Sequence, residues 1–170
     1  MLIGMMGCGK SSVGRKAGEI LAVPFVDTDE IIEGRLQMSI PHIFEKYGEA
    51  YFRVMESDAA RQAASLPGAV ISTGGGMVLR PSNMAILKAA GVVIYLRCGA
   101  EQLYERTKDD SIRPLLGVPD RLARIKELLA EREPLYNKYS DLTVDIECAT
   151  IEELSEMICD EYRRNQRAKH

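Results

Sequence analysis

The first residues of the chain, MLIGMMGCGKSS, carry the strongest chemical signal in the sequence. Gly4, Gly9, Lys10 and Ser11 match the spacing G-x-x-x-x-G-K-[ST] of a phosphate-binding loop at every required position. Glycines let backbone N–H groups converge on phosphate oxygens, a lysine supplies a charge toward the β and γ phosphates, and the next hydroxyl ligates Mg²⁺. The stretch, called the phosphate loop below (residues 4–11), predicts a nucleoside triphosphate site.

Two further polar stretches each follow a short apolar run. Asp27, Thr28 and Asp29 come after PFV, and STGGG at 72–76 comes after AVI. In parallel α/β sheets the ligand crevice lies outside the carboxyl ends of the strands, so both stretches are expected there. One carboxylate would face a metal and the other a substrate hydroxyl, while the glycines would expose N–H groups to a ligand. The alternatives are that Asp27 or Thr28 only caps a helix and that STGGG is only a tight turn.

Three arginines add to these signals by their positions. Arg53 precedes Glu56 by three residues on a predicted helix, so an ion pair would hold its guanidinium, although a solvated surface pair is the commoner meaning of that spacing. Arg132 ends a predicted helix just before Pro134. Arg113 lies within KDDSIRPLLGVPD, residues 108–120, which predicts a loop of the length that serves as a lid or binding segment.

Size and charge restrict the class of protein. With 170 residues, 46% of them hydrophobic, the chain is long enough for one well-buried core and too short for two ordinary domains. Residues 1–170 are therefore expected to form a single domain. A net charge of -3 argues against the broad basic face that nucleic acid requires and favours a small-molecule partner.

Cysteine use and hydropathy indicate the compartment. The four cysteines show no C-x-x-C spacing, which argues against a zinc site or a disulfide framework and favours a reducing cytosol. No apolar window approaches the length of a membrane-spanning helix. We expect a cytoplasmic monomer without membrane contact, or an organellar one if a leader has been removed.

Short apolar runs alternate with longer amphipathic stretches, which predicts a parallel β-sheet of about five strands wrapped by helices. The strands are expected to be buried on both faces, and they are LI before the glycines, PFVD at 24–27, AVIS at 69–72, VVIYL at 92–96 and LTVDI at 142–146. Helical patterns cover 40–65 and start at 10, 28, 81, 100, 120 and 150. Thr150 and Glu153 match a capping box.

The series GMMGCGKSS, DTD, FEKYGEAYFR, STGGG, RPLL and ER followed by PLY resembles the shikimate kinase family along nearly the whole chain. The resemblance implies a P-loop fold of the nucleoside monophosphate kinase type, with a lid at about 109–119 and a substrate-binding helical region at about 30–65. It also implies ATP with Mg²⁺, and transfer of the γ-phosphoryl to the 3-hydroxyl of shikimate. The products would be shikimate 3-phosphate and ADP, in aromatic amino-acid biosynthesis.

The resemblance assigns the nucleotide and metal contacts position by position. Ser11 would ligate Mg²⁺, with Asp27 as a further or water-mediated contact. Arg106 would stack on adenine, and Arg113 would close with the lid onto the transferring phosphoryl group. The remaining residues implied to hold the ATP phosphates are Gly7, Cys8, Gly9, Lys10 and Ser12. No arginine follows at 148–150, where the family closes over adenine, so that contact stays unassigned.

The resemblance also assigns the shikimate contacts. Arg53 and Arg132 would grip the carboxylate, Gly75 and Gly76 would offer backbone contacts, and Asp29 would meet the hydroxyls and orient or deprotonate the nucleophile. The planar fork of arginine suits a carboxylate, so physical chemistry favours the same pairing. The implied catalytic residues are Lys10, Asp29 and Arg113.

Three other functions remain as alternatives. A gluconate-type sugar-acid kinase also pairs a phosphate loop with a polyol carboxylate, and a nucleotide kinase is a more distant rival. STGGG and the YFR segment argue against both. A non-catalytic binding relative of the fold should lack Lys10, Asp29 or Arg113, and this chain has all three.

Overall fold

The computed structural model describes residues 1–109, 114–146 and 149–167. Its strands form one parallel sheet in the order β2-β3-β1-β4-β5. The strands are β1 (Leu2–Ile3), β2 (Phe25–Asp27), β3 (Val70–Ser72), β4 (Ile94–Arg97) and β5 (Leu142–Asp145). Each coincides with a predicted apolar run, and the predicted α/β class with a parallel sheet is confirmed.

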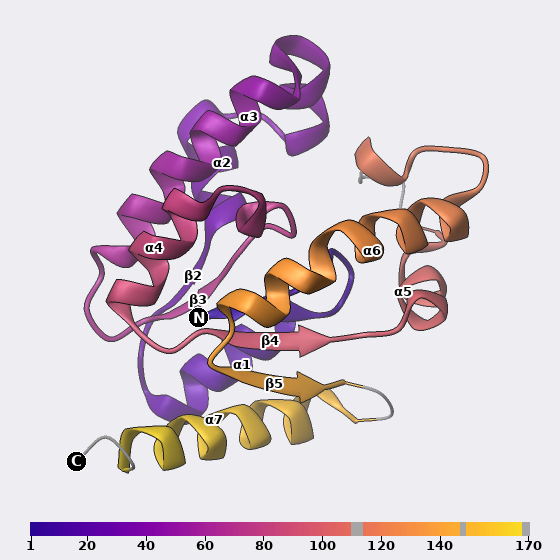
Figure 1. The fold of residues 1–170 in the computed structure, drawn as a ribbon. Helices are drawn as coiled ribbons and strands as arrows, with labels where there is room; N and C mark the ends of the chain where they lie inside the picture. The colour runs from indigo at the N-terminus through magenta and orange to yellow at the C-terminus, as the bar shows by residue number, and fades with distance from the viewer. Residues whose placement is uncertain (110–113, 147–148, 168–170) are drawn as a thin grey trace.

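Helices cover both faces of the sheet (Figure 1). One face carries α1 and α7, and the other carries α3, α4 and the C-terminal part of α6. The helices are α1 (Lys10–Leu21), α2 (Thr28–Leu36), α3 (Ile40–Ala64), α4 (Pro81–Ala90), α5 (Ala100–Thr107), α6 (Arg121–Tyr139) and α7 (Ile151–Arg167), with short 3₁₀ turns η1 (Met77–Leu79) and η2 (Pro114–Leu116). In the part of the chain that is described, none of them is long and apolar enough to span a membrane.

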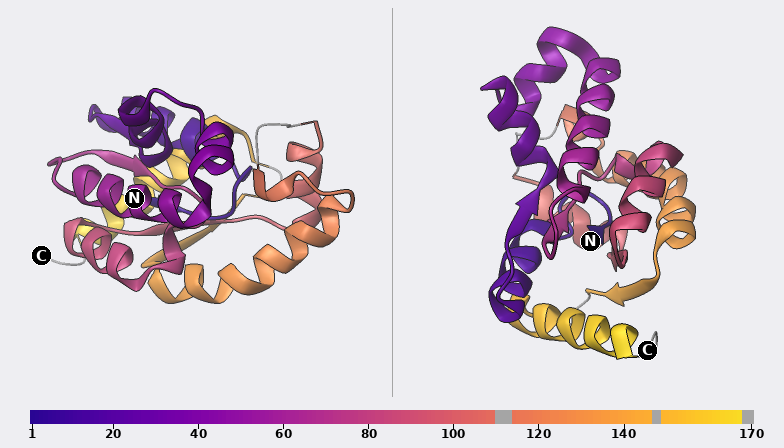
Figure 2. Two further views of the ribbon diagram at one scale, coloured as in Figure 1. Left: turned by 90° about the horizontal axis from the view of Figure 1, so that it is seen from above. Right: turned by 90° about the vertical axis from the view of Figure 1, so that its left-hand side faces the viewer.

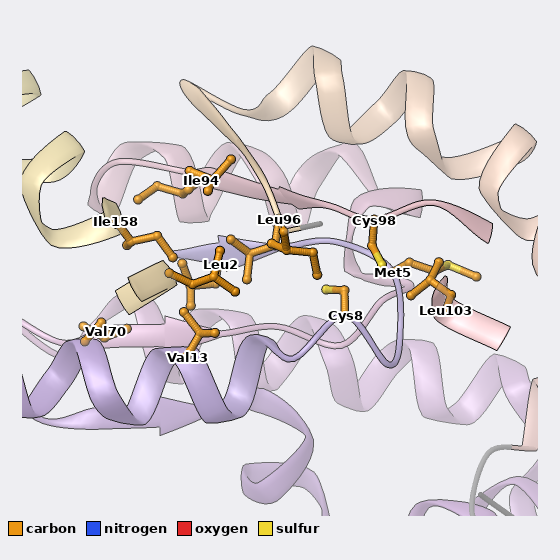
Figure 3. Packing of buried hydrophobic residues seen from close by; sticks show 14 of the residues in the cluster. Leu2, Met5, Cys8, Val13, Val70, Ile94, Leu96, Cys98, Leu103 and Ile158 are labelled. Atoms are coloured by element: carbon orange, nitrogen blue, oxygen red, sulfur yellow. The ribbon is translucent and has the colours of Figure 1, made fainter. Parts of the chain in front are cut away.

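Successive side chains of the central strands point to opposite faces and build separate clusters. Leu2 packs in one cluster with Val13 of α1 and Ile158 of α7 (Figure 3). Ile3 packs in the other with Ala60 of α3 and Met84 of α4. A third cluster joins α2 to α3 away from the sheet, and these two helices project beyond it in Figure 1 and in the right view of Figure 2. The period-2 alternation of the strands thus fixes both helical layers.

The expectation that every strand is buried on both faces is wrong for the edge strands. The residues of β1 and β3 are all buried, and only Arg97 of β4 is exposed. In β5, Thr143 and Asp145 are exposed, and Phe25 and Val26 of β2 are only partly buried. β2 and β5 lie at the two ends of the sheet order, where no further strand covers them.

Local signals set the helix starts. The predicted capping box is present: Glu153 N–H donates to Thr150 Oγ1 at 3.2 Å, and Thr150 N–H donates to Glu153 Oε2 at 2.8 Å. Asp120 accepts from Ala123 N–H at 2.9 Å and so caps α6. The helices predicted to start at 120 and 150 therefore start one residue later, with the predicted residues as their caps.

Two helices differ from the prediction. α6 does not end before Pro134 but continues to Tyr139, because Tyr136 is completely buried and holds the last turns in the core. The helix predicted over 40–65 is kinked at Gly48, whose φ of 78° lies in the left-handed region. Tertiary packing in one case and a single glycine in the other override the local pattern.

The contact between α1 and the sheet gives a first prediction. A methyl group on Gly14 would come within 2.6 Å of Phe25 Cε2 and 3.3 Å of Leu2 Cδ1. Gly14→Ala should therefore lower the free energy of unfolding by about 1–2 kcal/mol, despite the higher helix propensity of alanine. Gly34 in α2 has open space at the same position, so Gly34→Ala should raise it by about 0.5–1 kcal/mol.

Chemical denaturation of the two variants beside the parent protein measures both effects. A stabilised Gly14→Ala protein would contradict the close packing of α1 on the sheet.

Candidate active site

Two adjoining clefts open at the carboxyl ends of β1, β2 and β3. The first, of about 410 Å³, is lined by the phosphate loop and is called the loop cleft. The second, of about 260 Å³, is lined by Arg53 and Arg132 and is called the arginine cleft. Both clefts share the residues Met6, Asp29, Glu33 and Gly75. The junction is where a phosphate donor in one cleft would meet an acceptor in the other.

Lys10 lies inside the phosphate loop. Its ammonium donates to the carbonyl oxygens of Gly4 and Met5 at 3.0 and 2.9 Å, and the residue is only 7% exposed. Gly9, just before α1, has a φ of 89°, which favours glycine. The turn there presents the positive amino end of α1 to the loop cleft, so the loop is built to receive an anion.

Asp27 joins the second strand to the phosphate loop. Its Oδ2 accepts from Ser11 Oγ at 2.6 Å, and its Oδ1 accepts from the backbone N–H of Asp29 at 2.9 Å. The capping alternative and the metal prediction are therefore compatible, because Oδ1 caps α2 while Oδ2 lies beside the Ser11 hydroxyl. Within the described residues no cluster of three or more His, Cys, Asp or Glu could hold a metal alone. Mg²⁺ fits a hydroxyl and a carboxylate supplemented by phosphate oxygens.

Asp29 lies where the two clefts meet. Burial, with the nearby carboxylates of Asp27 and Glu56, raises its pKa to about 7, against the opposing effect of the Lys10 ammonium. Its Oδ1 is buried and has no hydrogen-bond partner in the described part of the chain. A carboxyl group with this pKa can accept a proton from a bound hydroxyl near neutral pH.

Arg53 is buried and paired. Its NH1 donates to Glu56 Oε2 at 2.6 Å, its NH2 donates to Glu49 Oε1 at 2.6 Å, and the residue is 8% exposed. The Arg53–Glu56 pair is therefore not the solvated surface pair that its spacing most often means. A Cβ atom on Gly76 would clash with Arg53 NH1, so the absence of a side chain at Gly76 leaves the room that the guanidinium occupies.

Arg132 is a buried guanidinium in the arginine cleft. The residue is 2% exposed, yet its Nε and NH1 have no hydrogen-bond partner among the residues described. A buried guanidinium with free donors is costly unless an anion pairs with it. Its fork-shaped donors match a carboxylate in shape and charge. The cleft is thus prepared for a small anionic ligand.

The predicted nucleotide contacts have different outcomes. Arg106 of α5 lines the loop cleft, where its NH1 donates to the Cys8 carbonyl oxygen at 3.5 Å, and its stacking on adenine stays a prediction. The Cys8 side chain is fully buried in the core (Figure 3), so a nucleotide contact can use only its backbone. Arg113, with the rest of 110–113, lies outside the described residues, as do residues 147–148.

The structure brings the other predicted site residues together. The loop cleft is lined by Gly7, Gly9, Lys10, Ser11, Ser12, Asp27 and Asp29. The arginine cleft is lined by Asp29, Arg53, Gly75, Gly76 and Arg132. The phosphate loop, Asp29 and Gly75 meet because the strands that precede them, β1, β2 and β3, are neighbours in the sheet. Arg53 and Arg132 are instead placed by α3 and α6.

Sequence reasoning missed the apolar wall and part of the charge balance of the arginine cleft. Phe44 and Phe52 line it with ring centroids 4.8 Å apart, and Glu49 holds Arg53. Phe44, Glu49 and Phe52 all lie in the segment FEKYGEAYFR, but the kink at Gly48 separates them. A regular helical repeat would not have placed the two rings together, so no periodic signal could have found this wall.

A parallel sheet in this order, with a phosphate loop after its first strand and a second cleft beside the loop, defines a P-loop kinase. The family model for shikimate kinase matches residues 6–163, and the chain belongs to the shikimate kinase family. The shikimate kinase of Thermodesulfovibrio yellowstonii is 45% identical over 169 residues, which are 99% of this chain and 97% of that protein. The predicted resemblance is thereby confirmed.

Further relatives agree with this family. The shikimate kinase of Caldanaerobacter subterraneus subsp. tengcongensis is 44% identical over 95% of this chain and 94% of its own. The solved shikimate kinase from Acinetobacter baumannii in complex with shikimate has a TM-score of 0.94 at 36% identity, covering 96% of this chain and 92% of that one. A gluconokinase from Sinorhizobium meliloti, at 16% identity and a TM-score of 0.61, shares the fold alone.

The buried Asp29 carboxyl generates a prediction about stability. Its pKa of about 7 in the folded protein lies above the usual value of 3.8, so between these values the folded protein holds a proton that the unfolded chain has released. Stability contributed by this group is therefore present below pH 4 and is lost as pH rises to 7. Asn cannot titrate, so the stability of Asp29→Asn relative to the parent should rise by about 3–4 kcal/mol from pH 4 to pH 8.

Denaturation curves at several pH values measure this difference, and Asp160→Asn on the exposed face of α7 is the control for an exposed carboxylate. If the difference between Asp29→Asn and the parent does not vary with pH, the Asp29 carboxyl is not perturbed.

Proposed function

We propose that this chain transfers the γ-phosphoryl group of ATP to the 3-hydroxyl of shikimate, giving shikimate 3-phosphate and ADP. The observation that carries the proposal is Arg132, whose buried Nε and NH1 lack hydrogen-bond partners among the described residues, in a cleft that adjoins the phosphate loop. Shikimate is a small carboxylate with several hydroxyl groups, so one end suits Arg132 and the other suits Asp29. The relative solved in complex with shikimate supports this choice of substrate.

The substrate carboxylate would bind between two guanidiniums that differ in whether their donors are already paired. Arg132 has free donors, whereas Arg53 is already paired with Glu49 and Glu56. Glu49 is half exposed, so the Arg53 donors it occupies are those that an incoming carboxylate could reach most easily. The ring would then lie against Phe44 and Phe52, which exclude water from the charged contacts.

Asp29 would act on the nucleophile. As the 3-hydroxyl oxygen attacks the γ-phosphorus, the bond from that phosphorus to the β–γ bridging oxygen breaks, and the hydroxyl proton passes to the Asp29 carboxylate. A pKa near 7 matches this role, because the group is then partly ionised in the free protein and its carboxylate is basic enough to accept the proton. Its position at the shared edge of both clefts supports this assignment.

Cations stabilise the negative charge on the phosphoryl group during its transfer. Lys10 lies within the phosphate loop and would move its ammonium from loop carbonyls to phosphate oxygens. Arg106 would contact the nucleotide, and Arg113 would approach from a lid at about 109–119. Ser11 and Asp27 would hold Mg²⁺ together with phosphate oxygens, and this ion when bound neutralises charge on the β and γ phosphates.

We further propose that residues 1–170 work as a monomeric single domain in which residues 30–65 bind the substrate. Both clefts are lined by residues of one chain, which supports an active site complete without a second copy. Cys8 and Cys159 are free thiols, which supports a reducing compartment such as the cytoplasm.

A coupled ADP-release assay with shikimate, gluconate and AMP in parallel tests the function. Turnover should occur with shikimate and should need Mg²⁺. Lys10→Ala should lose it, while Lys16→Ala on the exposed side of the same helix should keep it. Turnover of gluconate or AMP in place of shikimate would refute the proposed substrate, and inactivity with all three would favour a non-catalytic relative.

The carboxylate grip gives a prediction of its own. Arg132→Lys keeps the charge but loses the fork, so it should weaken shikimate binding by about ten- to a hundredfold while leaving the KM for ATP nearly unchanged. Arg124→Lys on the same helix, where the side chain is exposed and pairs with Glu127, is the matched control. Equal shikimate affinity in the two variants would remove Arg132 from the substrate site.

A further inference from the structure

Tyr136 links α6 to the glycine loop after β3. Its hydroxyl donates to the Gly75 carbonyl oxygen at 2.6 Å, although the two residues are 61 positions apart. The residue is completely buried, one helical turn beyond Arg132. Burial raises the pKa of the hydroxyl above its usual range, against the opposing effect of the Arg132 guanidinium, so the group remains a donor.

Gly75 occupies the junction of the two clefts. It lines both of them, and a Cβ atom on it would come 3.0 Å from the backbone nitrogen of Met6. The Gly75 backbone is therefore pressed against the phosphate loop on one side and tied to α6 on the other. The Tyr136 hydroxyl also lies 4.0 Å from Met5 Sδ, so the same side chain contacts the loop directly.

The hydrogen bond to Gly75 also orients the next amide. In a trans peptide the carbonyl oxygen and the following N–H point in opposite directions, and the described chain contains no cis peptide. With the Gly75 carbonyl directed at Tyr136, the Gly76 N–H points away from α6. Within the described residues neither the Gly75 nor the Gly76 N–H donates to a protein acceptor, whereas the Gly74 N–H donates to Thr28 Oγ1 at 3.1 Å.

We infer that the Tyr136 hydroxyl is a positioning group that orients the Gly75–Gly76 peptide toward the substrate and keeps it in register with Arg132. Helix α6 carries Arg132 and, through Tyr136, also holds the Gly75–Gly76 peptide. The Gly76 N–H and the Arg132 guanidinium are therefore fixed relative to each other on the arginine cleft. Tyr136 does not touch the reacting atoms. The inference deepens the proposed function, since it assigns what sets the geometry of the same substrate site.

Tyr95 provides an internal comparison. Its ring stacks on that of Tyr136 with centroids 4.9 Å apart and planes 24° apart. Both residues are buried in the same cluster, yet the Tyr95 hydroxyl has no hydrogen-bond partner in the described residues. Replacing either tyrosine by phenylalanine makes the same chemical change in the same surroundings, and only one replacement removes a hydrogen bond.

Steady-state kinetics of Tyr136→Phe and Tyr95→Phe test the effect on the substrate. Tyr136→Phe should raise the KM for shikimate about three- to tenfold, as expected for one lost hydrogen bond, and leave the KM for ATP within about twofold. The reason is that Gly76 and Arg132, whose relative position this bond sets, line the arginine cleft and not the loop cleft. Tyr95→Phe should change neither value. A KM for shikimate that is equal in the two variants, or a parallel rise in both KM values with a lowered Tm, would overturn the inference.

Amide hydrogen exchange of the ligand-free protein tests the positioning without any substrate. Peptides that cover residues 73–79 should exchange faster in Tyr136→Phe than in the parent, because the bonds from Gly74 to Thr28 and from Met77 to Gly74 lose their support. Tyr95→Phe should exchange as the parent does. Unchanged exchange in Tyr136→Phe would overturn the inference, while failure of the parent to phosphorylate shikimate would overturn only the proposed function.

Discussion

The structure depends on a buried positive charge whose hydrogen-bond donors are left unpaired by the residues that the structure describes. Arg132 is almost completely enclosed, and its Nε and NH1 are without hydrogen-bond partners among the described residues. Across the same cleft, one carboxylate oxygen each of Asp29 and Glu56 is also buried and without a partner there. Such atoms cost free energy that the fold must offset, and a ligand with an anionic end and hydroxyl groups would satisfy both signs. The site therefore consists of buried polar atoms without hydrogen-bond partners among the described residues, held in fixed positions by the packed helices and strands.

The frame holds these atoms because each comes from a well-packed element. Arg132 stands on α6, which is held in the core by the stacked rings of Tyr136 and Tyr95. Asp29 stands at the first turn of α2, capped by Asp27. The Gly75 peptide is fixed between the phosphate loop and α6. Electrostatic preorganisation of this kind is what phosphoryl transfer requires, since the reaction gains mainly from positioning and charge stabilisation.

Most of the fold and the gathering of several candidate residues at one edge of the sheet could be predicted, because their signals are local. The phosphate loop, the acidic pair at 27 and 29 and the glycines at 74–76 each follow an apolar strand, and the order of parallel strands brings their carboxyl ends together. The family resemblance rested on these motifs together with FEKYGEAYFR, RPLL and ER followed by PLY, and it was confirmed. The Thr150–Glu153 capping box could also be predicted, because all of its atoms lie within one helical turn.

The sequence by itself determined the strand–helix order, the phosphate loop and the family, since short apolar runs, glycine spacing and caps act over a few residues. Only the tertiary structure decided that Arg53 is buried and paired while Arg132 has unsatisfied donors, that Gly76 makes room for a guanidinium, and that α6 passes through Pro134. It alone joined Tyr136 to Gly75. The physical reason is that burial and hydrogen-bond partners are set by residues far apart in the chain, and no local pattern records which of them will meet.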